Sequence, residues 1–426
     1  MPWPGAAALE VANIWLYRGA WAGEFNLNDE LVPGITPFLT PPGRLQGKPQ
    51  RLKANENKSF IGSYVLGKGF VLEPDEASAL IARNPKNKDC LFPYLNGEDL
   101  NSRPDQSPSR WVINFQNFPL NRTADGVWLT ANEEQRKQWL RSGYVPFDYP
   151  KSVAEDYPDL IQILIERVKT ERDELVAKGK QIHEYCFWKF WDRRDNLYAT
   201  IAKKEKVLVT SRHNKILIFE FVKSDLIYSE ALAIFAVDRS VFSFLQSSIH
   251  DVWAWQNCST IRDAGIRYSP TDGFETFPFP IDFSQLKENG ERYLERRQSI
   301  LQSRREGLTK TYNRFHDPAE AAEDIVEFRR LQVEMDNAVA SAYGWQDLPL
   351  DHGFHETKQG IRYTISEAAR REVLDRLLEL NHQRYAEEVA AGLHDKKSAK
   401  SAGTGRGRKK KAEPAAANEP EQFQLF

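Results

Sequence analysis

The sequence is poor in cysteine and has no long apolar segment. It contains three cysteines, Cys90, Cys186 and Cys258, among 426 residues. Their wide spacing fits neither a disulfide framework nor a zinc site, so we expect buried free thiols. No apolar run approaches the roughly 18 residues that cross a bilayer, and the N-terminus lacks a basic region followed by an apolar one. The sequence therefore predicts a cytoplasmic protein that contacts no membrane.

Loops that bind phosphate or a methyl donor are also missing. The segment 65–70, "VLGKGF", has two glycines but lacks the third glycine and the helix that a phosphate-binding loop requires. An amino methyltransferase that acts on an extruded base needs an Asn/Asp-Pro-Pro-aromatic loop, which Asn84-Pro85 does not supply. The serines near His213 and His250 do not lie in a nucleophile elbow. The sequence thus predicts no catalytic residue, no metal ligand and no cofactor of its own.

One polar segment leaves a catalytic alternative open. Residues 351–358, "DHGFHETK", contain Asp351, Glu356 and Lys358 together with two histidines. A metal-dependent nuclease brings carboxylates and a lysine to a divalent cation. However, the two carboxylates lie closer in sequence than that pattern usually allows, and the segment is better explained as a polar turn before a helix. A nuclease that uses these three residues is therefore the alternative function.

The net charge of −2 conceals an uneven distribution. From Asp395 onward, eight Lys and Arg residues face four Asp and Glu residues, so the tail is basic and the rest is acidic. A chain of this kind can bind nucleic acid only through a local basic surface. The tail is rich in Lys, Ala, Gly, Ser, Glu and Pro, and cannot bury enough apolar surface to order itself.

The pattern of apolar residues predicts an α+β fold. Short β-rich runs, such as 63–72, 110–115 and 206–212, are separated by proline and glycine. Acidic residues in the first turn predict a helix over 73–83, and helical spacing of apolar residues after Pro158 predicts one over 157–178. We also expect strands over 215–222 and 225–237, a helix over 241–256, and an extended segment over 266–281 because its prolines disfavour a helix.

From Ser284 the pattern becomes helical. A heptad-like seam follows Ser284, a second helix is expected over 319–343, and a third starts near Thr364, which forms a capping box with Glu367. We therefore predict three parts, namely a mixed α/β target-recognition body, a helical scaffold segment and a disordered basic tail, at residues 1–283, 284–394 and 395–426.

Several long phrases resemble one family. They are "LFPYLNGEDLNSRPDQSPSRWVINF", "VLVTSRHNKILIFEFV", "FSFLQSSIHDVWAW", "RYSPTDGFETFPFP", "GLTKTYNRFHDP" and "MDNAVASAYGW". They are similar to the C-terminal DNA-specificity region of bacterial MmeI-like restriction-modification proteins, whose target-recognition part resembles the TaqI-like specificity domain. The resemblance covers residues 3–394.

The resemblance implies sequence-specific recognition of double-stranded DNA in phage defence. In the family, an adenine-specific methyltransferase domain would precede Trp3, and that domain would bind S-adenosylmethionine. We therefore expect this chain to be the specificity part, made separately or left by truncation, with methyl transfer supplied by a separate or missing methyltransferase domain or subunit.

The resemblance also directs attention to polar segments that could contact DNA. In "PYLNGEDLNSRPDQSPSRWVINF", which we expect to be a loop, Arg103 and Arg110 suit phosphate or guanine, and Asn96 and Asn101 suit adenine edges. A surface turn held by Asp99 is the structural alternative. The remaining candidates lie in three further Arg- or Lys-bearing segments and are Arg212, Asn214, Lys215, Arg262, Arg267, Lys310, Asn313 and Arg314.

These further segments also have structural explanations. Residues 212–215 fit a solvated turn between strands, and 310–314 fit a helix end where Tyr312 packs between helices. Trp188 and Trp191 could stack on an extruded base, but aromatic residues at helical spacing usually belong to the core.

The last six residues, "EQFQLF", resemble the peptide by which many bacterial DNA-processing proteins bind the replicase sliding clamp. Gln422, Leu425 and Phe426 would be the contacting residues. The preceding "GRGRKKK" can attract phosphate without sequence preference, or can serve only for solubility. A protein-interaction scaffold that docks through its helices and tail is the remaining alternative.

Overall fold

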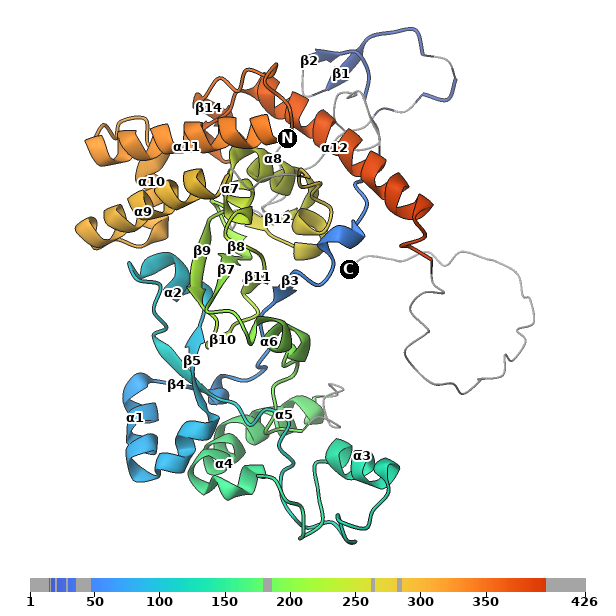
Figure 1. The fold of residues 1–426 in the computed structure, drawn as a ribbon, viewed down its shortest axis with the longest axis vertical. Coiled ribbons are helices and arrows are strands. Elements are labelled where there is room, and N and C mark those ends of the chain that lie inside the picture. The colour runs from blue at the N-terminus through green and yellow to red at the C-terminus, as the bar shows by residue number, and fades with distance from the viewer. Residues whose placement is uncertain are drawn as a thin grey trace.

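The computed structural model has strands at its middle and helices at both ends (Figure 1). It describes residues 15, 17–19, 21–27, 30–35, 47–178, 186–261, 265–281 and 286–395. Among them, no helix is both long and apolar enough to span a membrane. The mixture of helices and sheets confirms the predicted α+β class.

One end of the molecule is built on a four-stranded mixed sheet. Its order is β10-β5-β6-β4, in which β5 pairs antiparallel with β6 and parallel with β10. The strands are β4 (Val71–Leu72), β5 (Leu91–Leu95), β6 (Arg110–Ile113) and β10 (Ile227–Tyr228). Buried Phe70, Phe115 and Tyr157 belong to its core.

Helices α1 (Pro74–Arg83), α4 (Pro158–Leu164) and α5 (Thr170–Ala177) lie at this end (Figure 1). Pro74 and Pro158 each occupy a first helical turn, where the missing proline N–H costs no hydrogen bond. The helix predicted over 157–178 is present, but a π-helical turn, Ile165–Lys169, separates α4 from α5. A further helix, α3 (Glu133–Ser142), was not predicted from the sequence.

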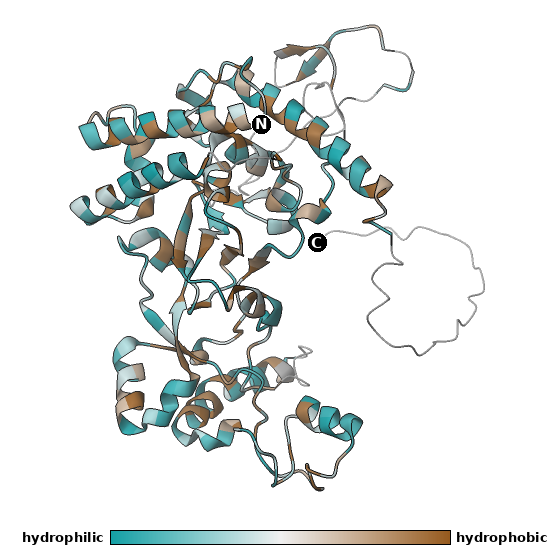
Figure 2. Cartoon of the chain, viewed as in Figure 1, coloured by the Kyte–Doolittle hydropathy of each residue, from teal (hydrophilic) through white to brown (hydrophobic). Residues whose placement is uncertain are grey.

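The central sheet is antiparallel throughout, with the order β3-β11-β7-β9. Its strands are β3 (Ser59–Ile61), β7 (Lys206–Ser211), β9 (Phe219–Lys223) and β11 (Leu232–Phe235). Every residue of β11 is buried, because both faces of this strand are covered. Hydrophobic residues accordingly dominate the centre of the molecule (Figure 2).

A small sheet continues from the end of β7. It consists of β8 (His213–Asn214), β12 (Ser259–Ile261) and β13 (Gly265–Arg267) in the order β12-β13-β8. Nearby, α6 (Asp195–Ile201) begins after Arg194, which has the left-handed φ of 58°.

The other end is helical. It contains α7 (Val241–Gln246), α8 (Ser248–Asn257), α9 (Leu286–Arg304), α10 (Leu308–Phe315), α11 (Glu323–Ala342) and α12 (Glu367–Ala390). The single helix predicted over 241–256 is interrupted at Ser247, whose extended backbone and side chain cap α8. Ser366, rather than Thr364, caps α12.

Two further predictions need correction. Residues 97–102 form helix α2 (Gly97–Ser102) instead of an open loop. Within the segment expected to be extended, Pro270–Phe274 forms a π-helical turn, because Pro270 stands at its start, where proline is tolerated. The hairpin β14 (Gly353–Thr357) and β15 (Gly360–Thr364) precedes α12, as the turn interpretation of that segment implied.

One hydrophobic core crosses the predicted boundary between residues 283 and 284. The ring of Tyr293 on α9 lies 6.1 Å from that of Phe242 on α7 and 4.6 Å from that of Phe328 on α11. Phe235 of the central sheet belongs to the same core. The helical segment therefore packs directly on the sheet, and the limits given for the three parts stay a prediction.

Candidate nucleic-acid interface

Helix α2 forms in place of the predicted loop because the side chains of Asn96 and Asp99 accept hydrogen bonds from backbone N–H groups. The side chain of Asn96 caps the helix by accepting a 2.9 Å hydrogen bond from the Asp99 N–H. Asp99 is buried, and its carboxylate accepts a 3.0 Å hydrogen bond from the Ser109 N–H. Both side chains thus stabilise the local backbone, as the structural alternative for Asp99 implied.

Asn101, the other residue of this helix that was predicted to contact DNA, lies against a second candidate segment, which contains Asn214. The Asn214 side-chain amide donates to Oδ1 of Asn101 over 3.3 Å, which joins β8 to α2. A Cβ atom on Gly97 would lie 3.2 Å from Ser211 Oγ, so the start of α2 also approaches the end of β7. Two candidate segments that are distant in the sequence are therefore neighbours.

Arg212 and Arg267 complete this group. Arg267 on β13 is exposed and pairs across the strands with His213. The backbone N–H of Arg212 donates to Ala231 O over 2.8 Å, and its carbonyl accepts from the Tyr268 N–H over 2.7 Å. We name Asn101, Arg212, Asn214, Lys215 and Arg267 the junction surface, because they lie where the central sheet meets α2 and the small sheet.

The electrostatics of the junction surface are unusual. Burial, followed by the charges of Arg267 and Arg194, lowers the pKa of Arg212, and Glu230 opposes this shift. Burial and the neighbouring Arg212 and Arg267 likewise lower the pKa of His213, so this imidazole is predominantly neutral at pH 7. Arg194 was not among the residues predicted from the sequence. It belongs to the segment "DRRD", residues 192–195, which does not indicate the distant residues that Arg194 approaches in the fold.

Helix α10 packs against α2 beside this surface. A Cβ atom on Gly307 would approach the carbonyl carbon of Ser102 to 2.3 Å, so the start of α10 touches the end of α2. Lys310 and Asn313 on α10 are exposed. Arg314 instead forms 2.9 Å ion pairs with both Glu306 and Glu320, whose carboxylates compensate for its positive charge.

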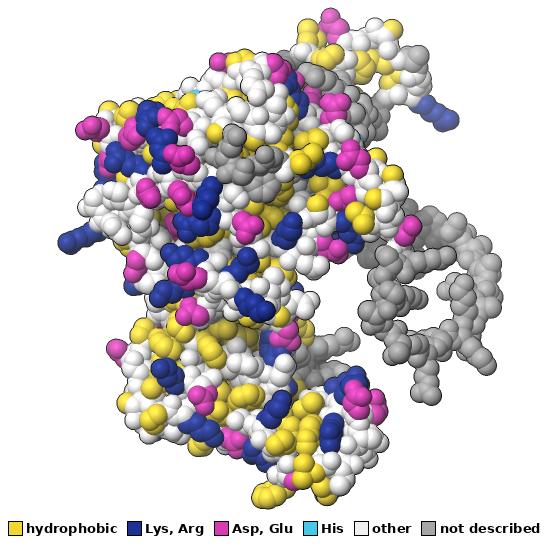
Figure 3. Space-filling model, viewed as in Figure 1, with side chains coloured by type: hydrophobic (Ala, Val, Ile, Leu, Met, Phe, Trp, Pro, Cys, Tyr) yellow, Lys and Arg dark blue, Asp and Glu magenta, His cyan; other side chains and the backbone are white. Residues whose placement is uncertain are grey.

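The remaining arginines of the first candidate segment lie farther along it. Arg103 Nε donates to Ser107 Oγ over 2.9 Å, and Arg110 pairs with Glu73 over 2.9 Å. Their side chains stay 45% and 44% exposed, so they could exchange these partners for phosphate. On the face drawn in Figure 3, Lys and Arg are interspersed with Asp and Glu, so no broad area of one charge appears on that face.

Four predicted residues cannot be placed. Arg262, Gln422, Leu425 and Phe426 lie outside the described residues. The tail prediction for residues 395–426 falls there as well, apart from Asp395.

The residues of the nuclease alternative do not form a metal site in the described part of the chain. No group of three or more His, Cys, Asp and Glu residues there could hold a metal ion. His352 pairs over 2.9 Å with buried Asp336 on α11, and His355 hydrogen-bonds the backbone carbonyl of Asp351. Trp188 is buried and donates to Phe118 O over 2.9 Å, as expected of a core residue.

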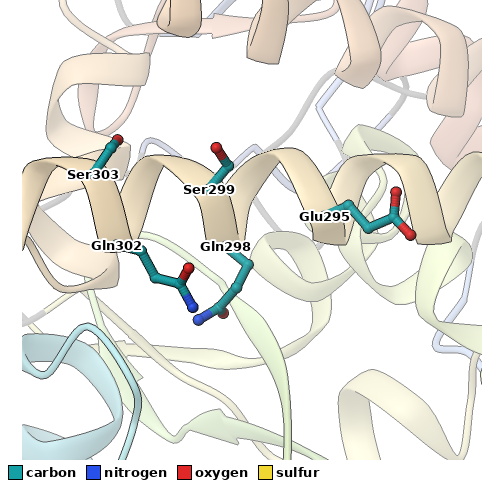
Figure 4. Close-up of a pocket in the computed structure, with 5 residues that line it drawn as sticks. All are labelled: Glu295, Gln298, Ser299, Gln302 and Ser303. Atoms are coloured by element: carbon teal, nitrogen blue, oxygen red, sulfur yellow. The ribbon is translucent and has the colours of Figure 1, made fainter.

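A shallow hollow on α9 offers no catalytic arrangement. It is lined by Glu295, Gln298, Ser299, Gln302 and Ser303. Figure 4 shows that all five side chains project from the same helix. Its one carboxylate has no second titratable group in the lining with which to share acid–base chemistry.

The region that contains Arg212 and Arg267 is similar to a known family of domains. The family model of the MmeI target recognition domain matches residues 148–281. No curated protein sequence matches the chain significantly.

A solved structure supports the same fold. It is the Type IIL restriction-modification enzyme MmeI in complex with DNA, with a TM-score of 0.52 and 15% sequence identity. The match covers 84% of this chain and 39% of the MmeI chain. The present chain thus corresponds to well under half of that enzyme.

Proposed function

We propose that the chain recognises a defined sequence in double-stranded DNA, because residues 148–281 match the family model of the MmeI target recognition domain. It would do so as the specificity part of a restriction-modification enzyme. The observation that carries this proposal is the coincidence of the matched region with the junction surface. Arg212, Asn214, Lys215 and Arg267 all lie within the matched residues.

The chemistry of the junction surface suits duplex recognition. Side-chain amides can hydrogen-bond a base edge in the major groove. The NH₂ group of Asn101 and the second side-chain N–H of Asn214 would be the donors, because Oδ1 of Asn101 accepts from Asn214 and Oδ1 of Asn214 accepts from the Lys215 N–H. Arginine and lysine can hold the flanking phosphates and fix the register of the duplex. Lys310 and Asn313 on the adjacent α10 would extend the contact, as would Arg103, Arg110 and Arg262.

Catalysis belongs to a partner in this proposal. A methyltransferase domain or subunit with bound S-adenosylmethionine would modify adenine in the recognised site. The present chain would supply the sequence preference in the bacterial cytoplasm, as part of defence against phage. Gln422, Leu425 and Phe426 would contact the replicase sliding clamp.

Selection from a randomised duplex library tests the central proposal. The purified chain is expected to retain duplexes that share one short motif, and its affinity for them should fall steeply with salt because bound phosphates release counterions. Arg83→Gln combined with Arg330→Gln, on α1 and α11, is a control that removes two positive charges from helices that contribute no residue to the junction surface. Retention of random sequences, with no enriched motif, would refute sequence-specific recognition.

A further inference from the structure

Three arginines from separate elements gather at one edge of the junction surface. Arg194 precedes α6, Arg212 links β7 to β8, and Arg267 ends β13. The Tyr268 N–H donates to the Arg212 carbonyl over 2.7 Å, which places the adjacent Arg267 beside Arg212. Ser63 Oγ donates to the Arg193 carbonyl over 3.1 Å, and Ser63 pairs with Ser229, next to the Glu230 carbonyl that Arg212 Nη1 contacts. The charges of Arg194 and Arg267 accordingly both act on Arg212. Like charges repel, so such a group is favourable only when anions compensate for it.

Within the part of the chain that the structure describes, this charge is compensated only in part. Arg194 pairs with Asp192 over 2.9 Å, and the carboxylate of Glu230 also acts on Arg212. Two carboxylates of the described residues therefore face three guanidinium groups. His213, the other basic side chain beside Arg212, adds little charge because it is predominantly neutral at pH 7.

Two of the arginines are held in place and still have an unused donor. Arg212 Nη1 donates to the Glu230 carbonyl over 2.9 Å, while Arg194 is fixed by its pair with Asp192. The Nε atoms of both residues are buried and have no hydrogen-bond partner among the described residues. A desolvated donor without an acceptor is unfavourable, and such groups in folded proteins usually have a partner.

We propose that Arg194, Arg212 and Arg267 together bind one phosphodiester group of the DNA backbone. A phosphodiester carries one negative charge and two non-bridging oxygens, which suit the planar donor arrays of guanidinium groups. The contact fixes the position of the duplex beside Asn101 and Asn214 and carries no base preference itself. This inference rests on the proposed function and adds Arg194 to the residues that contact DNA.

The test compares the Arg194→Gln/Arg267→Gln variant with the charge-matched control Arg83→Gln/Arg330→Gln. Arg212 is left intact because its side chain also holds the Glu230 carbonyl. Affinity is measured over a range of salt concentrations for a selected duplex and for an unrelated one. The first variant should bind both duplexes about tenfold more weakly, and its log–log salt slope should be smaller by about 0.9, the value for one phosphate. Its selected motif should stay unchanged.

Neutral methylphosphonate linkages locate the contact. One substituted position in the selected duplex should weaken wild-type binding but leave the arginine variant unaffected, since the variant no longer uses that phosphate. Inorganic phosphate serves as the probe for a free-phosphate site. If the arginines bind free phosphate and not DNA, inorganic phosphate will raise the thermal unfolding temperature of the wild type but not of the arginine variant. The two proteins will then bind duplexes with equal affinity, which would overturn the proposal.

The outcomes separate this inference from the proposed function. Equal affinity and salt slope in the variant and the control would overturn the phosphate site even when a motif is selected. A changed motif would assign these arginines to base reading and would also overturn it. If the wild type binds duplexes without selecting a motif, the proposed function fails, and the unrelated duplex still tests the phosphate site. Absence of all duplex binding would overturn both.

Discussion

Asn214 donates its side-chain amide to Oδ1 of Asn101, although the two residues are 113 positions apart. The bond joins the small sheet to helix α2. The Asn214 oxygen also accepts a 2.8 Å hydrogen bond from the Lys215 N–H, so a ligand can use the second Asn214 side-chain N–H and the NH₂ group of Asn101. The relationship places two side-chain amides at one point of the junction surface.

Replacement of both amides tests this arrangement. In the Asn101→Ala/Asn214→Ala variant, the selected motif should lose preference at one or two positions, each by about 1–3 kcal/mol, because amide contacts to a base edge disappear. Sequencing of retained duplexes measures the change. Asn337→Ala, at an exposed position on α11, is the control. An unaltered motif would exclude these amides from base recognition.

Gly307 provides a test of the contact between the target-recognition body and the helical segment. Gly307→Ala places a methyl group against the Ser102 carbonyl and should force α10 away from α2. Overpacking of this kind costs about 1–3 kcal/mol of unfolding free energy, which urea denaturation measures. Duplex affinity should fall as well, because α2 positions Asn101.

Gly353→Ala is the matched control, since the added atom would have only an ordinary 3.4 Å contact with His355. Equal stability of the two variants would show that the approach of α10 to α2 is not tight.

Arg297 is expected to be essential for the stability of the shared core. It is fully buried, pairs with Glu220 over 3.0 Å and donates to Tyr312 Oη over 3.0 Å. Arg297→Met would leave the Glu220 carboxylate buried without its partner and should lower the unfolding free energy by about 3–5 kcal/mol. The double variant Arg297→Met/Glu220→Gln should recover part of this loss in urea denaturation. If the single and the double variant lose the same unfolding free energy, the effect of Arg297→Met comes from packing and not from the unpaired carboxylate.

His316 predicts a dependence of stability on pH. Burial, with Arg362 and Arg329 nearby, lowers its pKa from 6.5 to about 3, and its Nδ1 accepts a hydrogen bond from the Tyr363 N–H. The unfolded chain therefore binds a proton between pH 6.5 and 3 that the folded chain does not. The neutral His316 side chain therefore contributes fully to stability above pH 6.5, and this contribution is lost as the pH falls from 6.5 towards 3.

The His316→Gln variant removes this proton while its side-chain oxygen can still accept from Tyr363. Between pH 6 and 4, the unfolding free energy of the wild type should fall by about 1.4 kcal/mol per pH unit more than that of the variant. Above pH 7 the two curves should run parallel. Parallel curves at all pH values would contradict the low pKa of His316.

Local sequence patterns predicted many of the regular elements. Acidic residues in the first turn marked α1, first-turn proline and helical spacing of apolar residues marked α4, and β-rich runs marked β7 and β9. These signals are readable because neighbouring residues make the hydrogen bonds of a helix, or alternate between the faces of a strand. Helix α2 was missed because its cap at Asn96 looks like a polar turn when its tertiary partners are unknown.

The sequence by itself determined the α+β class, the candidate DNA-contacting segments and the family that they resemble. Only the tertiary structure decided which candidates meet: Asn101 with Asn214, and Arg212 with Arg267 and Arg194. It also committed Arg314 to two carboxylates and Asn96 to a helix cap. The physical reason is that a side chain's type is local, whereas its partners, its burial and the charges around it come from residues that only folding brings near.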